Sequence, residues 1–266
     1  MRKRSIWSAG FAATIALALV LVMTVMAGCG LTHEHPQAAM SSALSVETPV
    51  PIVVGVLPDE TGSTTWTRTP QVTPADIEPL YGLVLCRGGE VALGLIRDAS
   101  NRGLLRLRVE PPPVVTSAPQ KTGRPFEDAR RMGRYRKQRA ADESRLQEWR
   151  EQAASDVESF RERAAILLNH AADAPRTDVC GAIQRADTAL AEPNAVWPQA
   201  PHRWLVVVSD GQDNAHRCPP VTVLKSGAEL LAVNGNGDVG SIAALNPQVF
   251  ESVRAAVTYI CKQERR

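Results

Sequence analysis

Two apolar runs constrain the fold of this chain more than any other feature. Residues 52–57 read Ile-Val-Val-Gly-Val-Leu between two prolines, and residues 204–209 read Trp-Leu-Val-Val-Val-Ser. Apolar runs without polar alternation are typical of strands that are buried on both faces of a parallel sheet. The chain is therefore expected to build an α/β fold with helices covering both faces of its sheet.

Helical and strand patterns alternate along the rest of the chain. Thr73 followed by Pro74 predicts the start of a helix, and residues 90–96 and 103–109 predict two strands joined by a polar turn. Three further elements are expected: a helix over residues 179–190, a strand over 229–233 and a closing amphipathic helix over 248–262. This alternation predicts a doubly wound, mainly parallel sheet with one antiparallel edge strand.

The N-terminus has the pattern of an export signal. Residues 2–4 are basic, and residues 11–26 form an almost purely apolar run of sixteen residues, whereas a membrane-spanning helix needs about 20. The run ends in Met26-Ala27-Gly28-Cys29, which resembles the lipobox of bacterial lipoproteins, with Met26 where that family usually has Leu. The resemblance implies a signal peptide over residues 1–28 and lipidation of Cys29. An uncleaved anchor or an ordinary secretory signal is the alternative.

Each of these readings places the body of the chain outside the cytoplasm. In lipoproteins, Gly30 rather than Asp after the lipidated residue favours the outer membrane of a host that has one. Residues 29–49 lack periodicity and predict a flexible tether before a globular part over 50–266; His33 and His35 fit a solvated linker better than a metal site. The net charge of +2 gives no reason to expect nucleic acid as a partner.

A long charged helix is predicted from Pro125 to about residue 168. Its second half carries apolar residues at helical spacing: Leu146, Trp149, Ala153, Val157, Phe160, Ala164 and Leu167. Its first half carries six basic residues and no acid between Ala129 and Ala141. That half is expected to project into solvent, with a possible break at Gly133. It either touches anionic lipid or cell-wall polymer or is a solvated extension only.

Polar side chains stand where three predicted loops meet the sheet. Asp59, Thr61 and Ser63 follow the first strand, Thr177 precedes a helix, and Asp210 follows the second apolar run. Ligands of open parallel sheets gather outside the carboxyl ends of the strands. Two carboxylates and three hydroxyls form an all-oxygen set that suits a hard divalent cation such as Mg²⁺. Alternatively, the first three residues only cap a helix or shape a turn.

These motifs resemble the von Willebrand factor A (vWA) domain, whose metal ion-dependent adhesion site (MIDAS) combines an Asp-x-Ser-x-Ser loop with a distant Thr and a distant Asp. Asp59-x-Thr61-x-Ser63, Thr177 and Asp210 match in order, with Thr61 replacing the first Ser. The resemblance covers about residues 50–262 and implies a vWA or Rossmann-like fold, interrupted by a charged helical insertion at about 114–168. It also implies that Mg²⁺, Mn²⁺ or Ca²⁺ is completed by an acidic residue of a protein or peptide partner.

The favoured interpretation is a binding module and not an enzyme. His170, His202 and His216 lie in no recognisable motif and are interpreted as surface or structural residues, so no catalytic residue is proposed. A metal-dependent hydrolase would need a further base near Asp59 and Asp210. A metal-independent scaffold that assembles through the charged helix is the other alternative.

Four cysteines remain if Cys29 is lipidated, an even number for an oxidising compartment. The fold implied by the vWA resemblance places Cys180 near Cys218 and Cys86 near Cys261. Two disulfides with these pairings are therefore predicted, and buried unpaired thiols are the alternative.

Overall fold

The computed structural model describes residues 49–62, 64, 69–98, 100, 103–169, 174–192, 197, 200–215, 221–234 and 239–265. They belong to a compact unit, Thr48–Arg266, that is distinct from Met1–Glu47. The buried apolar residues of this unit form a core of its own, from Ile52 to Ile260. The predicted signal peptide, Cys29 and nearly all of the predicted tether lie outside the described residues. Within the described part, no helix is both long and apolar enough to cross a membrane.

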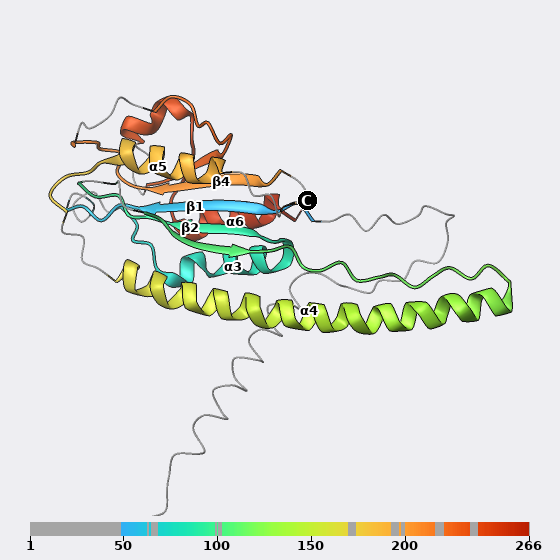
Figure 1. Cartoon of the computed structure of the whole chain (residues 1–266). Helices are drawn as coiled ribbons and strands as arrows, with labels where there is room; N and C mark the ends of the chain where they lie inside the picture. Colours follow the sequence, from blue (N-terminus) through green and yellow to red (C-terminus); the bar gives the residue numbers. More distant parts are fainter. Residues whose placement is uncertain are drawn as a thin grey trace, which may run out of the picture. The chain divides into compact units, whose positions relative to one another are not determined.

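A six-stranded sheet forms the centre of the unit, in the order β3-β2-β1-β4-β5-β6 (Figure 1). The strands are β1 (Ile52–Pro58), β2 (Gly89–Leu93), β3 (Leu105–Val109), β4 (His202–Val208), β5 (Glu229–Val233) and β6 (Gln248–Phe250). Every neighbouring pair is parallel except β2 and β3, which are antiparallel. The predicted α/β sheet, mainly parallel with one antiparallel edge strand, is confirmed.

Helices cover both faces of this sheet (Figure 1). On one face, α5 (Val179–Ala191) packs against alternate residues of the strands, such as Val53 and Leu205. On the other face lie α3 (Pro74–Arg87) and α6 (Val253–Gln263), which also contact each other. The two apolar runs are β1 and the core of β4, and both are buried between these layers, as their composition predicts.

The closing segment differs from its predicted form. Residues 248–262 were expected to be one helix, but Gln248–Phe250 pair with β5 as the edge strand β6. Ser252 then caps α6, accepting a hydrogen bond from the Ala255 amide at 3.2 Å. A 3₁₀-helix, Gly240–Leu245, precedes this strand and was not predicted. The free edge of β5 supplies backbone partners that a local helical pattern does not reveal.

The charged helix is α4 (Pro125–Leu168), 44 residues long, or about 66 Å at the usual rise. It runs through Gly133 without a break. Its C-terminal half packs on α3 and β3, and the ring of Phe160 meets that of Tyr81 edge to face at 5.7 Å. Its N-terminal half lies against the extended segment that follows β3 (Figure 1). There, Thr116 donates from its amide and hydroxyl to Asp142, at 2.8 and 2.6 Å. We call residues 111–149 the arm.

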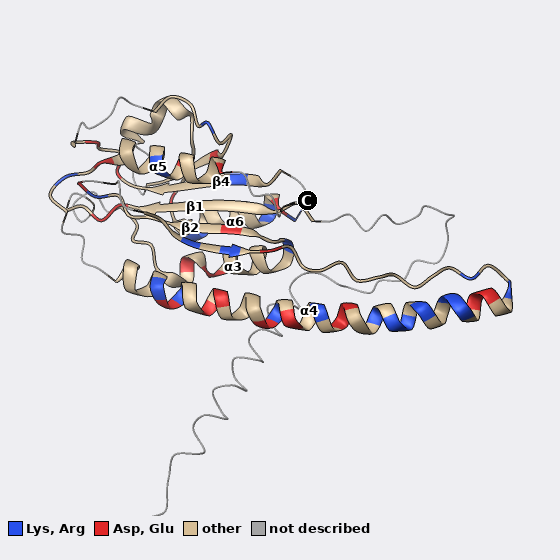
Figure 2. Ribbon diagram, viewed as in Figure 1, with Lys and Arg blue, Asp and Glu red and all other residues tan. Residues whose placement is uncertain are grey.

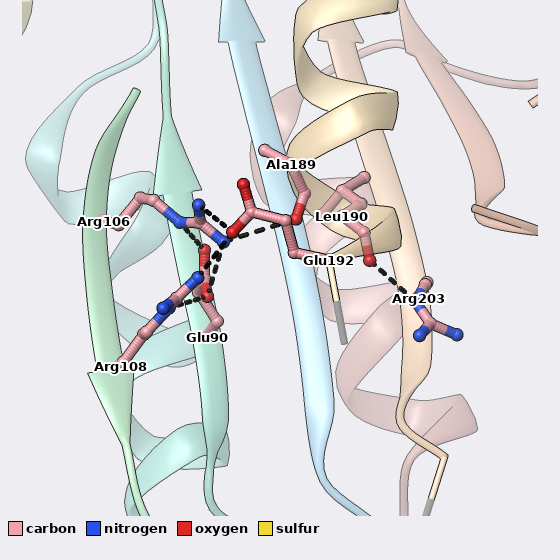
Figure 3. A network of polar contacts seen from close by, with 7 residues as sticks. All are labelled: Glu90, Arg106, Arg108, Ala189, Leu190, Glu192 and Arg203. Atoms are coloured by element: carbon pink, nitrogen blue, oxygen red, sulfur yellow. Dashed lines mark hydrogen bonds and ion pairs between the residues drawn. The ribbon is translucent and has the colours of Figure 1, made fainter. Parts of the chain in front are cut away.

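An ion-pair network around the buried Glu90 ties β3 to the end of α5 (Figure 3). The side chain of Glu90 on β2 is 2% exposed and pairs with both Arg106 and Arg108 of β3. The same two arginines reach Glu192, just after α5, at 2.7 and 2.9 Å. The antiparallel edge strand is thereby held to β2 by backbone bonds and to the end of α5 by side chains.

Candidate metal site

The candidate site lies beyond the carboxyl ends of β1 and β4. Asp59 directly follows β1, and its amide donates to the Val208 carbonyl at the end of β4, at 2.9 Å. Because β1 and β4 are adjacent and parallel, the polar residues that follow them emerge side by side. This is the edge of an α/β sheet at which ligands are usually bound.

A chain of hydrogen bonds joins the first two loops of the site. One carboxylate oxygen of Asp59, Oδ1, accepts from the Thr61 amide at 3.0 Å and from the Thr61 hydroxyl at 2.7 Å. The Thr61 hydroxyl in turn accepts from the Thr177 hydroxyl at 3.0 Å. Thr177 is completely buried and Thr61 is 2% exposed. Two residues that are 116 positions apart are therefore in direct side-chain contact at this edge.

The loop after β4 provides the third part of the site. Ser209 donates its hydroxyl to the second carboxylate oxygen of Asp59, Oδ2, at 2.7 Å. Asp210 is buried, and its Oδ1 accepts from the Gln212 amide at 3.0 Å. The backbone turns sharply at Gly211, where φ is +74° and a Cβ atom would meet the backbone of Val239. Asp210 follows β4, which is adjacent to β1 and its Asp59. The turn at the next residue requires glycine.

Burial and a neighbouring charge both act on the carboxylate of Asp59. The pKa of Asp59 is raised above its ordinary value, chiefly because burial disfavours the charged form and also because the charge of Asp210 repels it. The donors from Thr61 and Ser209 act in the opposite direction and lower it. The described donors to Asp59 are neutral, and none of the described Lys or Arg side chains forms an ion pair with it.

Asn214, which the sequence reasoning did not single out, fastens the threonine loop to the loop after β4. Its side-chain Oδ1 accepts from the Thr177 backbone amide at 2.7 Å. Its backbone amide donates to the Thr177 carbonyl at 3.1 Å. Asp213 accepts from the Cys180 amide in the first turn of α5, at 2.8 Å. The available signal was the run of acid and amide residues after the second apolar strand.

Three of the five residues predicted for the metal site are joined by hydrogen bonds: Asp59, Thr61 and Thr177. Asp210 follows the adjacent strand, and its charge acts on Asp59. Ser63 lies outside the described residues. The Asx-turn bond from Asp59 to the Thr61 amide is what a purely turn-shaping role requires. The bond between Thr61 and Thr177 is not local, so turn formation alone does not account for it. The donor set fits a hard cation, since it consists of carboxylate and hydroxyl oxygens.

No cluster of three or more His, Cys, Asp or Glu side chains that could hold a metal occurs among the described residues. The candidate site is of another kind, with two carboxylates supported by hydroxyls. His202 lies at the start of β4, at the other end of the strand from Asp59, with Nδ1 3.2 Å from both carboxylate oxygens of Glu264. His170 and His216 lie outside the described residues. No described histidine is therefore placed as the base that a hydrolase would need.

The predicted disulfide between Cys86 and Cys261 is wrong, because Cys261 has a free thiol. The helices that carry the two cysteines do pack together, as expected. They meet through the ion pair of Arg87 with Glu264 and through apolar residues such as Ile260, while Cys261 lies one residue further around α6. Cys218 lies outside the described residues, so the pairing of Cys180 with Cys218 stays a prediction.

Comparison with protein-family models, with curated proteins and with solved structures found no match. The interpretation of the site therefore depends on the residues themselves and on the contacts described above.

Proposed function

We propose that this chain is a bacterial envelope lipoprotein whose globular unit is a vWA-type binding domain. Asp59, Thr61, Ser63, Thr177 and Asp210 would hold Mg²⁺, or Mn²⁺ or Ca²⁺, and an acidic residue of a protein or peptide partner would complete the coordination. The observation that carries the proposal is the continuous set of hydrogen bonds from Asp59 through Thr61 to Thr177. These hydrogen bonds join side chains from two of the three loops of the MIDAS pattern.

The electrostatics of the site support a cation. The charge of Asp210 acts on Asp59, and the neutral donors around Asp59 only partly offset its burial. A divalent cation would compensate both carboxylates at once, and the threonine hydroxyls have lone pairs to offer it. Bound there, the cation would supply a positive charge to which a partner's carboxylate binds.

The architecture supports the same proposal. Helices on both faces, the strand order and the single antiparallel edge strand agree with the expected vWA or Rossmann-like arrangement. In that arrangement α4 would be the charged insertion. The lipid anchor on Cys29, and with it the location outside the cytoplasm, is supported by the lipobox-like sequence alone.

Isothermal titration of Mg²⁺ and Mn²⁺ into the Thr48–Arg266 unit tests the metal site. A double variant, Asp59→Ala with Asp210→Ala, removes both carboxylates. A matched control, Glu151→Ala with Glu162→Ala, makes the same change in charge at exposed positions of α4. We expect saturable binding to the parent and control units and none to the double variant. Equal binding to all three, or binding to none, would contradict the metal site; the second result would favour the metal-independent scaffold.

A second experiment tests the anchor on the full chain expressed in a bacterium. Partition into detergent is compared for the parent chain and for Cys29→Ser. We expect the parent to enter the detergent phase after loss of the signal peptide, and the variant to keep the signal peptide because the lipidation site is absent. Cleavage of Cys29→Ser to a water-soluble form would identify an ordinary secretory signal.

A further inference from the structure

Charge is distributed very unevenly along the arm and the rest of α4 (Figure 2). Residues 121–139 contain eight Lys or Arg and two acids, whereas residues 140–168 contain seven acids and four Lys or Arg. Helices with mixed charges pair them at a spacing of three or four residues, and the C-terminal half does so with Arg161 and Glu158. The positive charge is concentrated at the end of the arm that is remote from the sheet. We call residues 121–139 the arm tip.

The two acids of the arm tip are engaged in holding its turn. Asp128 accepts from the amide and the hydroxyl of Thr122, at 3.0 and 2.8 Å, and from the amide of Gly123 at 3.2 Å. Glu127 pairs with Arg124 at 3.3 Å. Four basic residues of the arm tip form no ion pair with any described residue: Arg130, Arg134, Arg136 and Lys137. Arg139 pairs with Glu143, just beyond the tip. The charges of the other four face solvent without an ion-pair partner among the described residues.

A large apolar side chain is exposed among these charges. Phe126, in the first turn of α4, is 86% exposed, the highest value among the large apolar residues that are exposed in the described part of the chain. It directly follows Pro125 and lies one turn from Arg130. An aromatic ring beside arginines is typical of segments that lie at a membrane interface, where the ring enters the boundary of the acyl chains. A water-soluble polyanion offers no apolar phase for this ring.

The geometry of the arm argues against a second copy of the chain as the partner. The inner stripe of α4 is already occupied by the extended segment, because Thr116 bonds to Asp142 and the Trp149 indole donates to the Glu110 carbonyl at 3.0 Å. The arm tip has no apolar seam at heptad spacing of the kind that coiled-coil partners need. Its exposed surface offers basic side chains and one phenylalanine.

We propose that the arm tip docks on an anionic phospholipid surface. The arginines and Lys137 bind the lipid phosphates, and Phe126 inserts at the level of the glycerol backbone. Each basic residue close to an anionic membrane adds to the attraction, and one aromatic ring adds apolar contact that electrostatics does not supply. This contact is independent of the metal site, and it would act on the unit without any lipid on Cys29.

Vesicle co-sedimentation of the Thr48–Arg266 unit tests the proposal, since this unit has its own core and lacks the apolar N-terminal run. Vesicles contain phosphatidylcholine alone or with phosphatidylglycerol. The tip variant is Arg130→Gln, Arg131→Gln, Arg134→Gln; the matched control, with the same change in charge, is Arg150→Gln, Arg163→Gln, Arg254→Gln. Phe126→Ser removes the ring, and thermal unfolding verifies that each variant is folded.

We expect binding to the anionic vesicles only, weakened at least about tenfold by the tip variant, weakened by high salt and nearly unchanged in the control. Phe126→Ser should weaken binding about threefold and leave its salt dependence unchanged. Equal loss in the tip and control variants would reduce the effect to net charge and overturn the proposal. Binding to soluble polyphosphate with no binding to vesicles, or a concentration-dependent dimer that masks the tip, would also overturn it.

Discussion

The two ends of the central strands differ in how they hold a carboxylate, which is buried at one end and half-buried at the other. At the amino end of β4, Glu264 is 1% exposed and receives Arg87, the indole of Trp204 at 2.8 Å and His202. At the carboxyl end of β1, the donors that Asp59 receives from the described residues are amide and hydroxyl groups of Thr61 and Ser209. A carboxylate that is matched by a cation of the protein stabilises the fold. Asp59 has neutral donors and a second acid nearby, so its negative charge is not matched by a cation of the described residues.

The largest effect should come from removing the matched carboxylate. Glu264→Ala leaves the Trp204 indole without its acceptor and Arg87 without its ion pair, so we expect the free energy of unfolding to fall by about 3 kcal/mol. Urea denaturation of the Thr48–Arg266 unit measures this loss, with the exposed Glu251→Ala as the control. A loss under about 1 kcal/mol would mean that the contacts of Glu264 contribute no more to stability than an exposed ion pair does.

Removing the charge of Asp59 should weaken metal binding and not the fold. We expect Asp59→Asn to change the stability of the metal-free unit by no more than about 1 kcal/mol, because it removes a charge that burial disfavours. At a Mg²⁺ concentration of about one hundred times Kd, the parent should gain about 2.7 kcal/mol and Asp59→Asn nothing. Thermal unfolding with and without Mg²⁺ measures both values. A large loss of stability in the metal-free unit would mean that Asp59, like Glu264, stabilises the fold.

The raised pKa of Asp59 predicts how the metal affinity and the stability of the metal-free unit depend on pH. Protons compete with the cation at a pKa above the ordinary 3.8, so Mn²⁺ affinity should fall about tenfold for each pH unit below that pKa. In the metal-free unit, the contribution of Asp59 to stability is complete below its unfolded-state pKa and is lost as the pH rises through the raised pKa. Mn²⁺ titrations and urea denaturation between pH 7 and pH 4 test this, with Asp59→Asn as reference. A Mn²⁺ affinity that does not change with pH would mean that Asp59 does not bind the cation.

The smallest effect should come from the buried hydroxyl of the second loop. Thr177→Val keeps the shape of the side chain but removes a hydroxyl that is proposed to hold the cation and that bonds to Thr61. We therefore expect Mg²⁺ to bind about tenfold more weakly. The cost to stability should be about 1 kcal/mol. Thr188→Val, on the solvent side of α5, is the control. If calorimetry shows equal affinities for the two variants, Thr177 serves only to position the loop.

Much of this fold could be predicted because the strands are coded locally. The unalternated runs of β1 and β4 identify a sheet with two covered faces, and β5 was predicted over the same five residues that it occupies. The short strand β6 could not be predicted, because its pairing depends on the free edge of β5. The packing of residues 111–124 along α4 was missed for the same reason: it depends on partners such as Thr116 and Asp142 that are distant in sequence.

The sequence allowed the residues of the candidate site to be chosen, but it did not allow the contacts between them to be predicted. The loops after β1 and β4 could be placed together, because adjacent parallel strands end at one edge. The bond between Thr61 and Thr177 requires the complete strand order, and the role of Asn214 requires the path of two loops. The error at Cys261 has a similar cause, since knowing that two helices are neighbours does not specify how each is rotated about its axis.

The paired bonds between Thr177 and Asn214 have a consequence for the speed and cost of binding. Two loops that are already joined through backbone and side-chain amides lose little conformational freedom when a ligand arrives. Little of the interaction energy is then spent on ordering them. We therefore expect a cation to enter at a rate governed by the release of its own hydration water, and its affinity to report the oxygen ligands themselves and not a rearrangement of the protein.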